Sequence, residues 1–446
     1  MFSRRGFIRV SSAAVGSLAL RPFGLLPALA QSGPDYRALV CIFLYGGNDS
    51  NNTVLPMDDT DFQAYTSIRR QLALTPADLT TPTTVSGSPI SFHGQLPSMA
   101  GLFSSKELAV IANVGPLVQP LTRTQYQQTG APVPLNLFSH PDQQRAWETS
   151  YPQGYSTTGW AGRVADFIAT QNYNANTIPM FLSTAGNNLL GTGASTQQIA
   201  LVPGEPLSLA GFDNSAESQA RYAAVTKLLT LNSGIALAQA ANQTLSNSLA
   251  DAQVLANALG KASPLKTVFP ATELGAQLLQ VAQVIQVQAA LGMRRQIFFC
   301  QLGGFDTHAD EMNTLFGLYA QLDPAIAAFY AATQELGVAD SVTTFTESDF
   351  SRTLQPATDG GADHGWGGNH FALGGAVSGG QIFGQFPTFE LGGPNDTDTR
   401  GRWIPTTASD QYGATLCEWF GVPNSVLPII FPNIANFPTQ KLGFLG

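Results

Sequence analysis

Four runs of consecutive apolar, β-prone residues divide the chain, and glycine or polar residues follow each of them. The runs cover residues 36–45, 107–115, 296–304 and 341–346. Uninterrupted apolar runs of this length are typical of strands that are buried on both faces, as in a parallel sheet. The pattern therefore predicts four core strands that lie far apart along the sequence.

Three longer stretches are rich in Ala, Leu and Gln and carry apolar residues at every third or fourth position. They cover residues 217–260, 273–293 and 310–336. This spacing places the apolar side chains on one face of a helix. Because the third stretch connects two predicted strands, it completes a strand–helix–strand unit of a parallel sheet.

Two segments, residues 115–136 and 386–412, are rich in Pro, Gly, Thr and Gln and are predicted to be long surface loops. The sequence has no internal repeat and no segment with the composition of an interdomain linker. We therefore predict a single α/β domain over residues 31–446, with a mostly parallel central sheet flanked by helices.

The first 30 residues have the pattern of a secretory signal peptide. Arg4 and Arg5 precede an apolar stretch over residues 10–20, and Ala28-Leu29-Ala30 offers a small-residue cleavage site. The stretch is too short for a stable transmembrane helix, and the paired arginines resemble a twin-arginine export signal. We expect the twin-arginine machinery to be a partner during export. The folded protein would reach the periplasm or the cell exterior, with no transmembrane segment in the mature chain.

The chain is acidic, with 21 basic and 30 acidic side chains and a net charge of −9. This balance disfavours nucleic acid or anionic lipid as the main partner. It does not exclude a small anionic substrate, because a bound metal ion would dominate the local field. The three cysteines do not predict a disulfide framework, and Cys41 and Cys300 are expected to be buried free thiols.

Acidic and histidine side chains follow three of the predicted strands. Asp49 comes after the first strand, Asp306 and His308 come after the third, and Glu347 and Asp349 come after the fourth. In open α/β sheets, ligands collect beyond the carboxyl ends of the strands. A glycine-rich loop over residues 363–370 could fold back over the same edge. The sequence therefore predicts a site for a divalent metal ion (Zn, Mn, Ca or Mg), with ligands from Asp49, Asp306, His308, Asp363, His364 and His370.

Several of these residues also have a structural interpretation. Asp306 could be a turn aspartate and His308 a surface histidine, and Asp363 could orient a histidine instead of binding metal. Asp310 is either a ligand or, as we favour, the N-cap of the following helix. His93 has no acidic neighbour and is expected to be structural.

Ser139 and His140 begin a predicted helix that ends near Thr149. Ser139 with Asp142 forms a variant of the capping box, which alone would explain both residues. A helix N-terminus also activates a nucleophile and binds anions. Ser139 is therefore a candidate nucleophile, and His140 a candidate ligand or general acid. Of two arginines that could clamp an oxyanion, Arg145 and Arg352, we favour Arg352 as the catalytic residue.

Several motifs occur together in a fixed order along the chain. They are Ser3-Arg4-Arg5, Gly46-Gly47-Asn48-Asp49, Ser139-His140, Gly159-Trp160-Ala161-Gly162-Arg163, Gly304-Phe305-Asp306-Thr307-His308, Ser348-Asp349-Phe350-Ser351-Arg352-Thr353 and Asp363-His364-Gly365. In this combination the chain resembles the DUF1501 family of exported bacterial proteins, which has no firmly assigned reaction. The resemblance implies a fold similar to the alkaline phosphatase/sulfatase superfamily, whose members act on phosphate and sulfate esters with one or two divalent metal ions.

By that resemblance Asp49 matches the acidic ligand after the first strand, Asp306 and His308 a later pair, and His364 or His370 the late histidine. The chain departs from the superfamily where Asp349 is followed by Phe350. We expect an exported metal-dependent hydrolase of phosphate or sulfate esters. The alternative is a non-catalytic envelope protein, with a structural or degenerate metal site, that acts in surface assembly or polymer binding.

Overall fold

β1 (Arg37–Leu44) lies inside the main sheet, between β8 (Arg295–Leu302) and β9 (Val342–Ser348), and is parallel to both. The computed structural model describes residues 35–446 apart from 176, 206, 208–211, 214 and 233. Leu44 pairs with both Leu302 and Ser348, so the carboxyl ends of the three strands are level. The loops that follow these strands therefore leave the sheet side by side.

Within the described residues this sheet has nine strands in the order β11–β5–β10–β9–β1–β8–β6–β7, with β12 paired to β5. β10 is antiparallel to both neighbours, and the other pairings in the sheet are parallel, which confirms the predicted mostly parallel sheet. The remaining bounds are β5 Leu108–Gly115, β6 Phe181–Ser183, β7 Gln198–Ala200, β10 Gly368–Leu373, β11 Ile382–Gly384 and β12 Thr407–Ala408.

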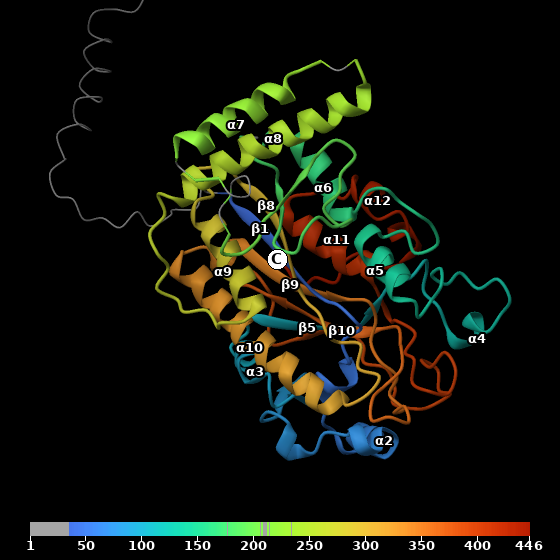
Figure 1. Cartoon of the computed structure of the whole chain (residues 1–446). Helices are drawn as coiled ribbons and strands as arrows, with labels where there is room; N and C mark the ends of the chain where they lie inside the picture. Colours follow the sequence, from blue (N-terminus) through green and yellow to red (C-terminus); the bar gives the residue numbers. More distant parts are fainter. Residues whose placement is uncertain (1–34, 176, 206, 208–211, 214, 233) are drawn as a thin grey trace, which may run out of the picture.

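Helices cover both faces of the sheet (Figure 1). One face carries α3 (Pro97–Ser104), α9 (Glu273–Gln286) and α10 (Glu311–Glu335). The other carries α5 (His140–Thr149), α6 (Trp160–Ala169), α11 (Ser409–Phe420) and α12 (Leu427–Ile430). α10 connects β8 to β9 and crosses over β1, so the predicted strand–helix–strand unit is present.

A smaller sheet with the order β2–β4–β3 lies outside the main sheet. Its strands are β2 (Val54–Pro56), β4 (Ser88–Phe92) and β3 (Thr83–Val85). α2 (Asp59–Arg69) leaves β2 directly, and the carboxylate of Asp58 caps it by accepting a hydrogen bond from the Asp61 amide at 3.0 Å. This unit brings the last residue of α2, Arg69, close to the ends of the central strands.

The four predicted core strands are confirmed as β1, β5, β8 and β9. The predicted helix over residues 217–260 is instead two helices, α7 (Ala216–Leu229) and α8 (Ala236–Leu259), which project from the body in Figure 1. Gly234 lies between them, directly before the N-cap of α8, with a φ of 72°, a conformation that suits glycine. The predicted loop 115–136 contains the short helix α4 (Arg123–Tyr126). Cys41 and Cys300 are buried free thiols, as predicted, and so is Cys417.

Residues 1–30, the predicted signal peptide, lie outside the described residues. None of the helices in the described part of the chain is long and apolar enough to cross a membrane.

Candidate metal centre

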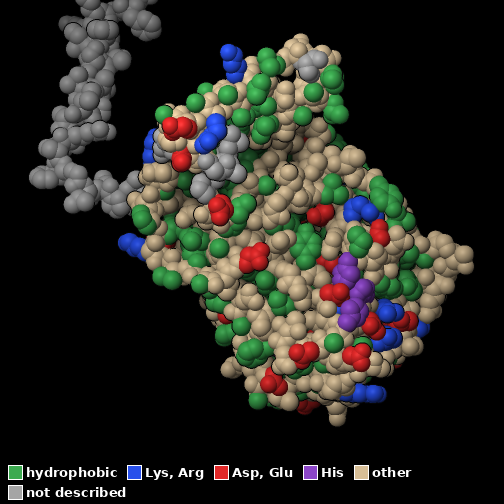
Figure 2. Space-filling model, in the orientation of Figure 1, with side chains coloured by type: hydrophobic (Ala, Val, Ile, Leu, Met, Phe, Trp, Pro, Cys, Tyr) green, Lys and Arg blue, Asp and Glu red, His purple; other side chains and the backbone are tan. Residues whose placement is uncertain are grey.

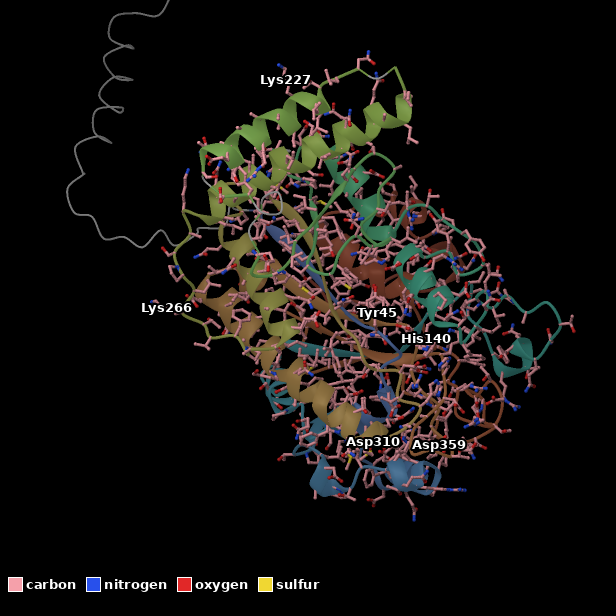
Figure 3. All side chains as sticks on the ribbon, viewed as in Figure 1. Tyr45, His140, Lys227, Lys266, Asp310 and Asp359 are labelled. Carbon is pink, nitrogen blue, oxygen red and sulfur yellow. The ribbon has the colours of Figure 1, made fainter. Side chains whose placement is uncertain are left out.

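Three histidines and one aspartate converge beyond the carboxyl ends of the central strands. His140 is the first residue of α5, Asp306 and His308 follow β8, and His364 precedes β10. Figure 2 shows histidine side chains gathered in one surface patch beside acidic and basic groups, and Figure 3 labels His140. The side chains of Asp306 and His308 are 49% and 48% exposed, so the cluster is open to solvent.

Each of the four converging atoms lies within 3.5 Å of at least two of the others. The Nε2 atom of His364 lies 3.1 Å from that of His140 and 2.9 Å from that of His308. The Oδ1 atom of Asp306 lies 3.4, 3.2 and 3.5 Å from the Nε2 atoms of His140, His308 and His364. A tetrahedral ion with bonds of about 2.0–2.1 Å holds its ligand atoms about 3.3 Å apart. The ligand atoms of His140, Asp306 and His364 all lie within 4.8 Å of one another, so these three residues could hold a metal ion, and His308 adjoins two of them.

The opposite nitrogen of each imidazole faces an acceptor. Nδ1 of His140 lies 2.6 Å from Oδ2 of Asp349, and Nδ1 of His364 lies 2.6 Å from the Phe138 carbonyl oxygen. Nδ1 of His308 lies 3.5 Å from Oδ1 of Asp363. Because a carbonyl or an ionised carboxylate can only accept, the proton of a neutral His140 or His364 ring lies on Nδ1. The Nε2 lone pairs then point at one another, an arrangement that repels unless a cation lies between them.

Asp349 is the main residue that the sequence-based ligand set missed. Its buried carboxylate accepts from Nδ1 of His140, from Nε2 of Gln144 at 2.9 Å and from the Gly46 amide at 3.2 Å. His140 and Gln144 lie one turn apart on α5 and so face the same carboxylate. The hydrogen bond to Asp349 raises the pKa of His140, whereas burial lowers the pKa of His364. The signal in the sequence was the position of Asp349 at a strand end.

The sequence had suggested that Arg352 clamps an oxyanion of the substrate. In the structure its guanidinium is instead paired with Asp306. Its NH2 group donates to Oδ1 of Asp306 at 2.9 Å, NH1 lies 3.5 Å from the Gly46 carbonyl oxygen, and the side chain is fully buried. Burial by itself would raise the pKa of Asp306, but the charge and hydrogen bond of Arg352 bring it below its ordinary value. Arg352 therefore keeps Asp306 ionised and oriented.

Ser139 lies at the N-cap position of α5, but its hydroxyl does not cap the helix. Its Oγ atom donates instead to Oδ2 of Asp142 at 2.7 Å, and Asp142 also accepts from Arg145 at 2.6 Å. The capping-box interpretation is therefore wrong in its geometry. Asp310 likewise occupies the N-cap position of α10 without capping it, because its carboxylate accepts from the Asn313 side chain at 2.6 Å.

Two predicted ligands, Asp49 and His370, lie apart from the cluster. The carboxylate of Asp49 is buried in an ion pair with Arg69 and accepts from the Asn51 side chain at 3.0 Å. His370 lies on the antiparallel strand β10, where its ring packs edge-on against Trp147 at 4.9 Å and burial lowers its pKa to about 3. The ligand set inferred from sequence is corrected at both positions.

Asp363 lies at the edge of the cluster instead of inside it. Its carboxylate pairs with Arg400 at 2.7 Å as well as facing His308. This placement matches the orienting interpretation of Asp363, one of the two that its sequence position had left open. His93, expected to be structural, is buried and accepts a hydrogen bond from the Gln95 amide at 3.0 Å.

Comparison with solved structures finds distant matches over most of the chain. The crystal structure of Ps i-CgsB has a TM-score of 0.36 at 10% identity and covers 89% of this chain and 77% of that one. The lipoteichoic acid synthase LtaP from Listeria monocytogenes has a TM-score of 0.32 at 9% identity, with 89% and 80% covered. The phosphonate monoester hydrolase of Agrobacterium radiobacter has a TM-score of 0.33 at 9% identity, with 89% and 77% covered.

In sequence, no curated protein matches the chain. A family description, "Protein of unknown function (DUF1501)", matches residues 36–397. This match includes β1, β8 and β9 and all four residues of the cluster. The chain therefore belongs to the DUF1501 family.

Proposed function

We propose that this protein is a metal-dependent hydrolase of phosphate or sulfate esters, with the metal bound by His140, Asp306, His308 and His364. The observation that carries the proposal is the convergence of three Nε2 atoms on the Oδ1 atom of Asp306, with each opposite Nδ1 atom facing an acceptor. One proton can bridge a single pair of nitrogens, whereas one divalent ion satisfies all three. An imidazole-rich set with one carboxylate favours Zn²⁺ over Ca²⁺ or Mg²⁺, which prefer oxygen ligands.

An open divalent site supplies a Lewis acid for an ester oxygen and lowers the pKa of an attacking hydroxyl or water. The chain's own groups prepare that chemistry. Asp349 fixes the ring of His140, the Phe138 carbonyl fixes that of His364, and Arg352 fixes the carboxylate of Asp306. The exposed sides of Asp306 and His308 leave room for an ester to approach from solvent.

The nucleophile in this proposal is the Ser139 hydroxyl, which belongs to the residue next to His140. Asp142 accepts its hydrogen bond, and the hydroxyl and Arg145 hydrogen bonds lower the pKa of Asp142 although partial burial opposes them, so this carboxylate is ionised at neutral pH. On attack, the Ser139 hydroxyl would give its proton to Asp142 and form a covalent bond to phosphorus or sulfur as the ester C–O oxygen leaves. That oxygen takes up a proton to become the alcohol, and water then hydrolyses the intermediate to restore the hydroxyl and release the acid. An activated water is the alternative nucleophile.

We also propose that residues 31–446 form the mature enzyme and that it works in the periplasm or outside the cell after export in the folded state. This part of the proposal rests on the sequence of residues 1–30.

The test is turnover by metal-saturated protein, purified after export in a bacterial host, on a panel of aryl phosphate, phosphodiester and sulfate esters. We expect Zn²⁺-dependent hydrolysis of at least one class and its loss in the double variant His308→Ala/His364→Ala. Exposed Lys266→Ala, remote from the cluster, serves as the matched surface control. Tight metal binding without turnover of any ester would overturn the hydrolase and favour a non-catalytic envelope protein.

A further inference from the structure

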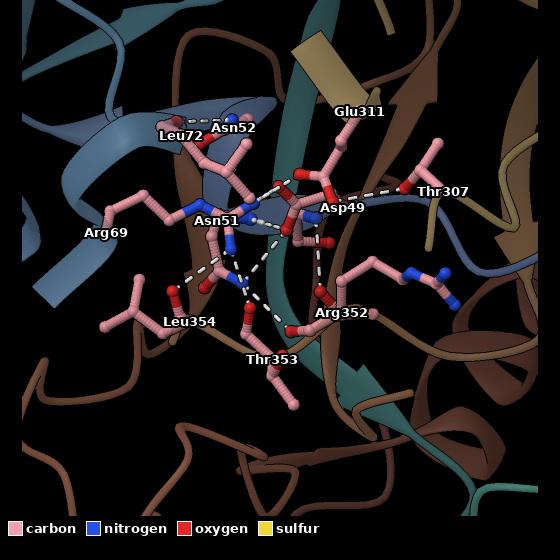
Figure 4. A network of polar contacts seen from close by, with 12 residues as sticks. Asp49, Asn51, Asn52, Arg69, Leu72, Thr307, Glu311, Arg352, Thr353 and Leu354 are labelled. Carbon is pink, nitrogen blue, oxygen red and sulfur yellow. Dashed lines mark hydrogen bonds and ion pairs between the residues drawn. The ribbon is translucent and has the colours of Figure 1, made fainter. Parts of the chain in front are cut away.

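Arg69 is a fully buried arginine whose guanidinium lies between two carboxylates. It ends α2, and its NH2 group donates to both Oδ2 of Asp49 and Oε1 of Glu311. Figure 4 shows the three side chains meeting, with hydrogen bonds running outward from them to Thr307, Thr353 and Leu354. None of the three is among the four converging ligands.

One arm of this network reaches the loop that carries Asp306 and His308. The second carboxylate oxygen of Glu311 accepts from the Thr307 hydroxyl at 3.2 Å. Thr307 is the residue between the two ligands, and its carbonyl oxygen accepts from the Ala362 amide at 3.0 Å. Glu311 is therefore hydrogen-bonded to the loop that carries Asp306 and His308, and through Thr307 it is linked to the segment that precedes His364.

The other arm reaches the segment that carries Arg352. The NH1 group of Arg69 donates to the carbonyl oxygens of Thr353 at 2.7 Å and Leu354 at 3.1 Å. Asn51 adds a bridge, because its amide donates both to Oδ1 of Asp49 and to the Arg352 carbonyl oxygen at 3.0 Å. One guanidinium thus connects the two segments that place Asp306 and its partner Arg352.

Arg69, Asp49 and Glu311 form a buried triad of charged groups, and the cost of burying charge indicates that this triad does not mainly stabilise the fold. Removing three charged groups from water is costly, and apolar replacements of buried ion networks are often as stable as the originals. Burial raises the pKa of Glu311, which shows the same cost at one member of the triad. What apolar side chains cannot replace is the forked set of hydrogen bonds to two carboxylates and two carbonyl oxygens.

We infer that Arg69 is a positioning residue for the metal centre, which sets the distance between the Asp306–His308 loop and the Arg352 segment. This inference rests on the proposed function, since it assigns a role toward the metal that the four ligands would hold. It predicts that metal affinity depends on the guanidinium fork even where the stability of the fold does not.

The experiment uses the full mature chain and compares metal-free protein with Zn²⁺ titrated by calorimetry. Arg69→Met leaves two buried carboxylates without their cation, so its Tm should fall. The Arg69→Met/Asp49→Asn/Glu311→Gln variant removes all three charges, and we expect its Tm to return toward the wild-type value. Its Zn²⁺ dissociation constant should nevertheless remain about 10- to 100-fold larger than that of the wild type.

Arg69→Lys keeps the charge and loses the fork, so it provides a second test if the triple variant does not fold. We expect a folded protein with Zn²⁺ affinity at least about tenfold weaker. Arg295→Lys is the matched control, because Arg295 is also buried and forked but lies at the start of β8, where it contacts Asp35 and the Phe420 carbonyl oxygen. It should change Tm without changing Zn²⁺ affinity.

Wild-type Zn²⁺ affinity in a folded triple variant or in Arg69→Lys would overturn the inference and leave the proposed function standing. Absence of Zn²⁺ binding by the wild-type chain would instead overturn the proposed function, and the role of Arg69 with it.

Discussion

Nδ1 of His140 lies 2.6 Å from Oδ2 of Asp349, a carboxylate with no exposed surface at the end of β9. This contact joins the helix on one face of the sheet to a central strand. It also turns Nε2 of His140 toward His364 and Asp306. A carboxylate behind a histidine fixes the ring and increases the basicity of the nitrogen that would bind metal.

Replacing Asp349 with Asn should therefore weaken Zn²⁺ binding by about 10- to 100-fold while leaving all four ligands in place. The amide can no longer hold the Nδ1 proton as strongly as the carboxylate. Titration of metal-free protein by calorimetry measures the effect. Asp363→Asn is the control, because its contact with His308 is 3.5 Å long and more exposed, so a smaller loss is expected. Equal losses in the two variants would contradict this ranking.

Arg352 is expected to act through Asp306 and not by direct contact with substrate. In Arg352→Lys the short hydrogen bond to Asp306 is lost or weakened, so Zn²⁺ affinity should fall. KM at saturating Zn²⁺ should change little, since the guanidinium is buried against Asp306. Steady-state kinetics at several Zn²⁺ concentrations separate the two effects. A large rise in KM that excess Zn²⁺ does not correct would restore Arg352 as an oxyanion clamp.

Ser139→Ala should lower kcat by several orders of magnitude if the hydroxyl is the nucleophile, because the remaining site cannot form the covalent intermediate. Zn²⁺ affinity should be unchanged, since Ser139 is not a ligand. A pre-steady-state burst in the wild type would report the same intermediate. Full turnover by Ser139→Ala would show that water is the nucleophile.

Glu148 gives a pH-dependent prediction. Burial, and then the nearby charge of Asp349, raise its pKa from the ordinary 4.5 to about 7. The folded protein therefore holds a proton that the unfolded chain releases between pH 4.5 and 7, and stability falls as pH rises through this window. Glu148→Gln removes that loss, so it should stabilise metal-free protein by on the order of 3 kcal/mol at pH 8 and by much less at pH 4.5.

Urea unfolding at the two pH values measures this difference. A stability gain of the same size at pH 4.5 and pH 8 would mean that the effect comes from packing and not from the titration of Glu148.

Much of the fold could be predicted from local pattern, and so could the four residues of the cluster: Asp306, His308 and His364 as ligands, and His140 as a ligand or general acid. Uninterrupted apolar runs identified the central strands, and the level ends of parallel strands explain why Asp306 and His308 reach the site. His364 lies in a loop whose glycines permit a close return. Gly365 is one of these, since a Cβ atom there would lie 2.7 Å from the Ser351 carbonyl oxygen.

The errors have long-range causes that the sequence pattern does not contain. Asp49 follows a strand as a ligand should, but Arg69, which reads as an ordinary helix residue, takes its carboxylate. His370 lies only six residues after His364, yet an antiparallel strand begins at Gly368 and carries the ring into the interior. Arg352 had the right residue type for anion binding, and only the position of Asp306 shows that it is already paired.

The central claim is that one divalent ion binds among His140, Asp306, His308 and His364, and anomalous diffraction at the zinc edge from Zn²⁺-loaded crystals tests it most directly. We predict one strong anomalous peak, about 2.0–2.1 Å from the three Nε2 atoms and from Oδ1 of Asp306. An empty cluster in zinc-saturated crystals, or a peak at Asp49 and Glu311 instead, would contradict the account.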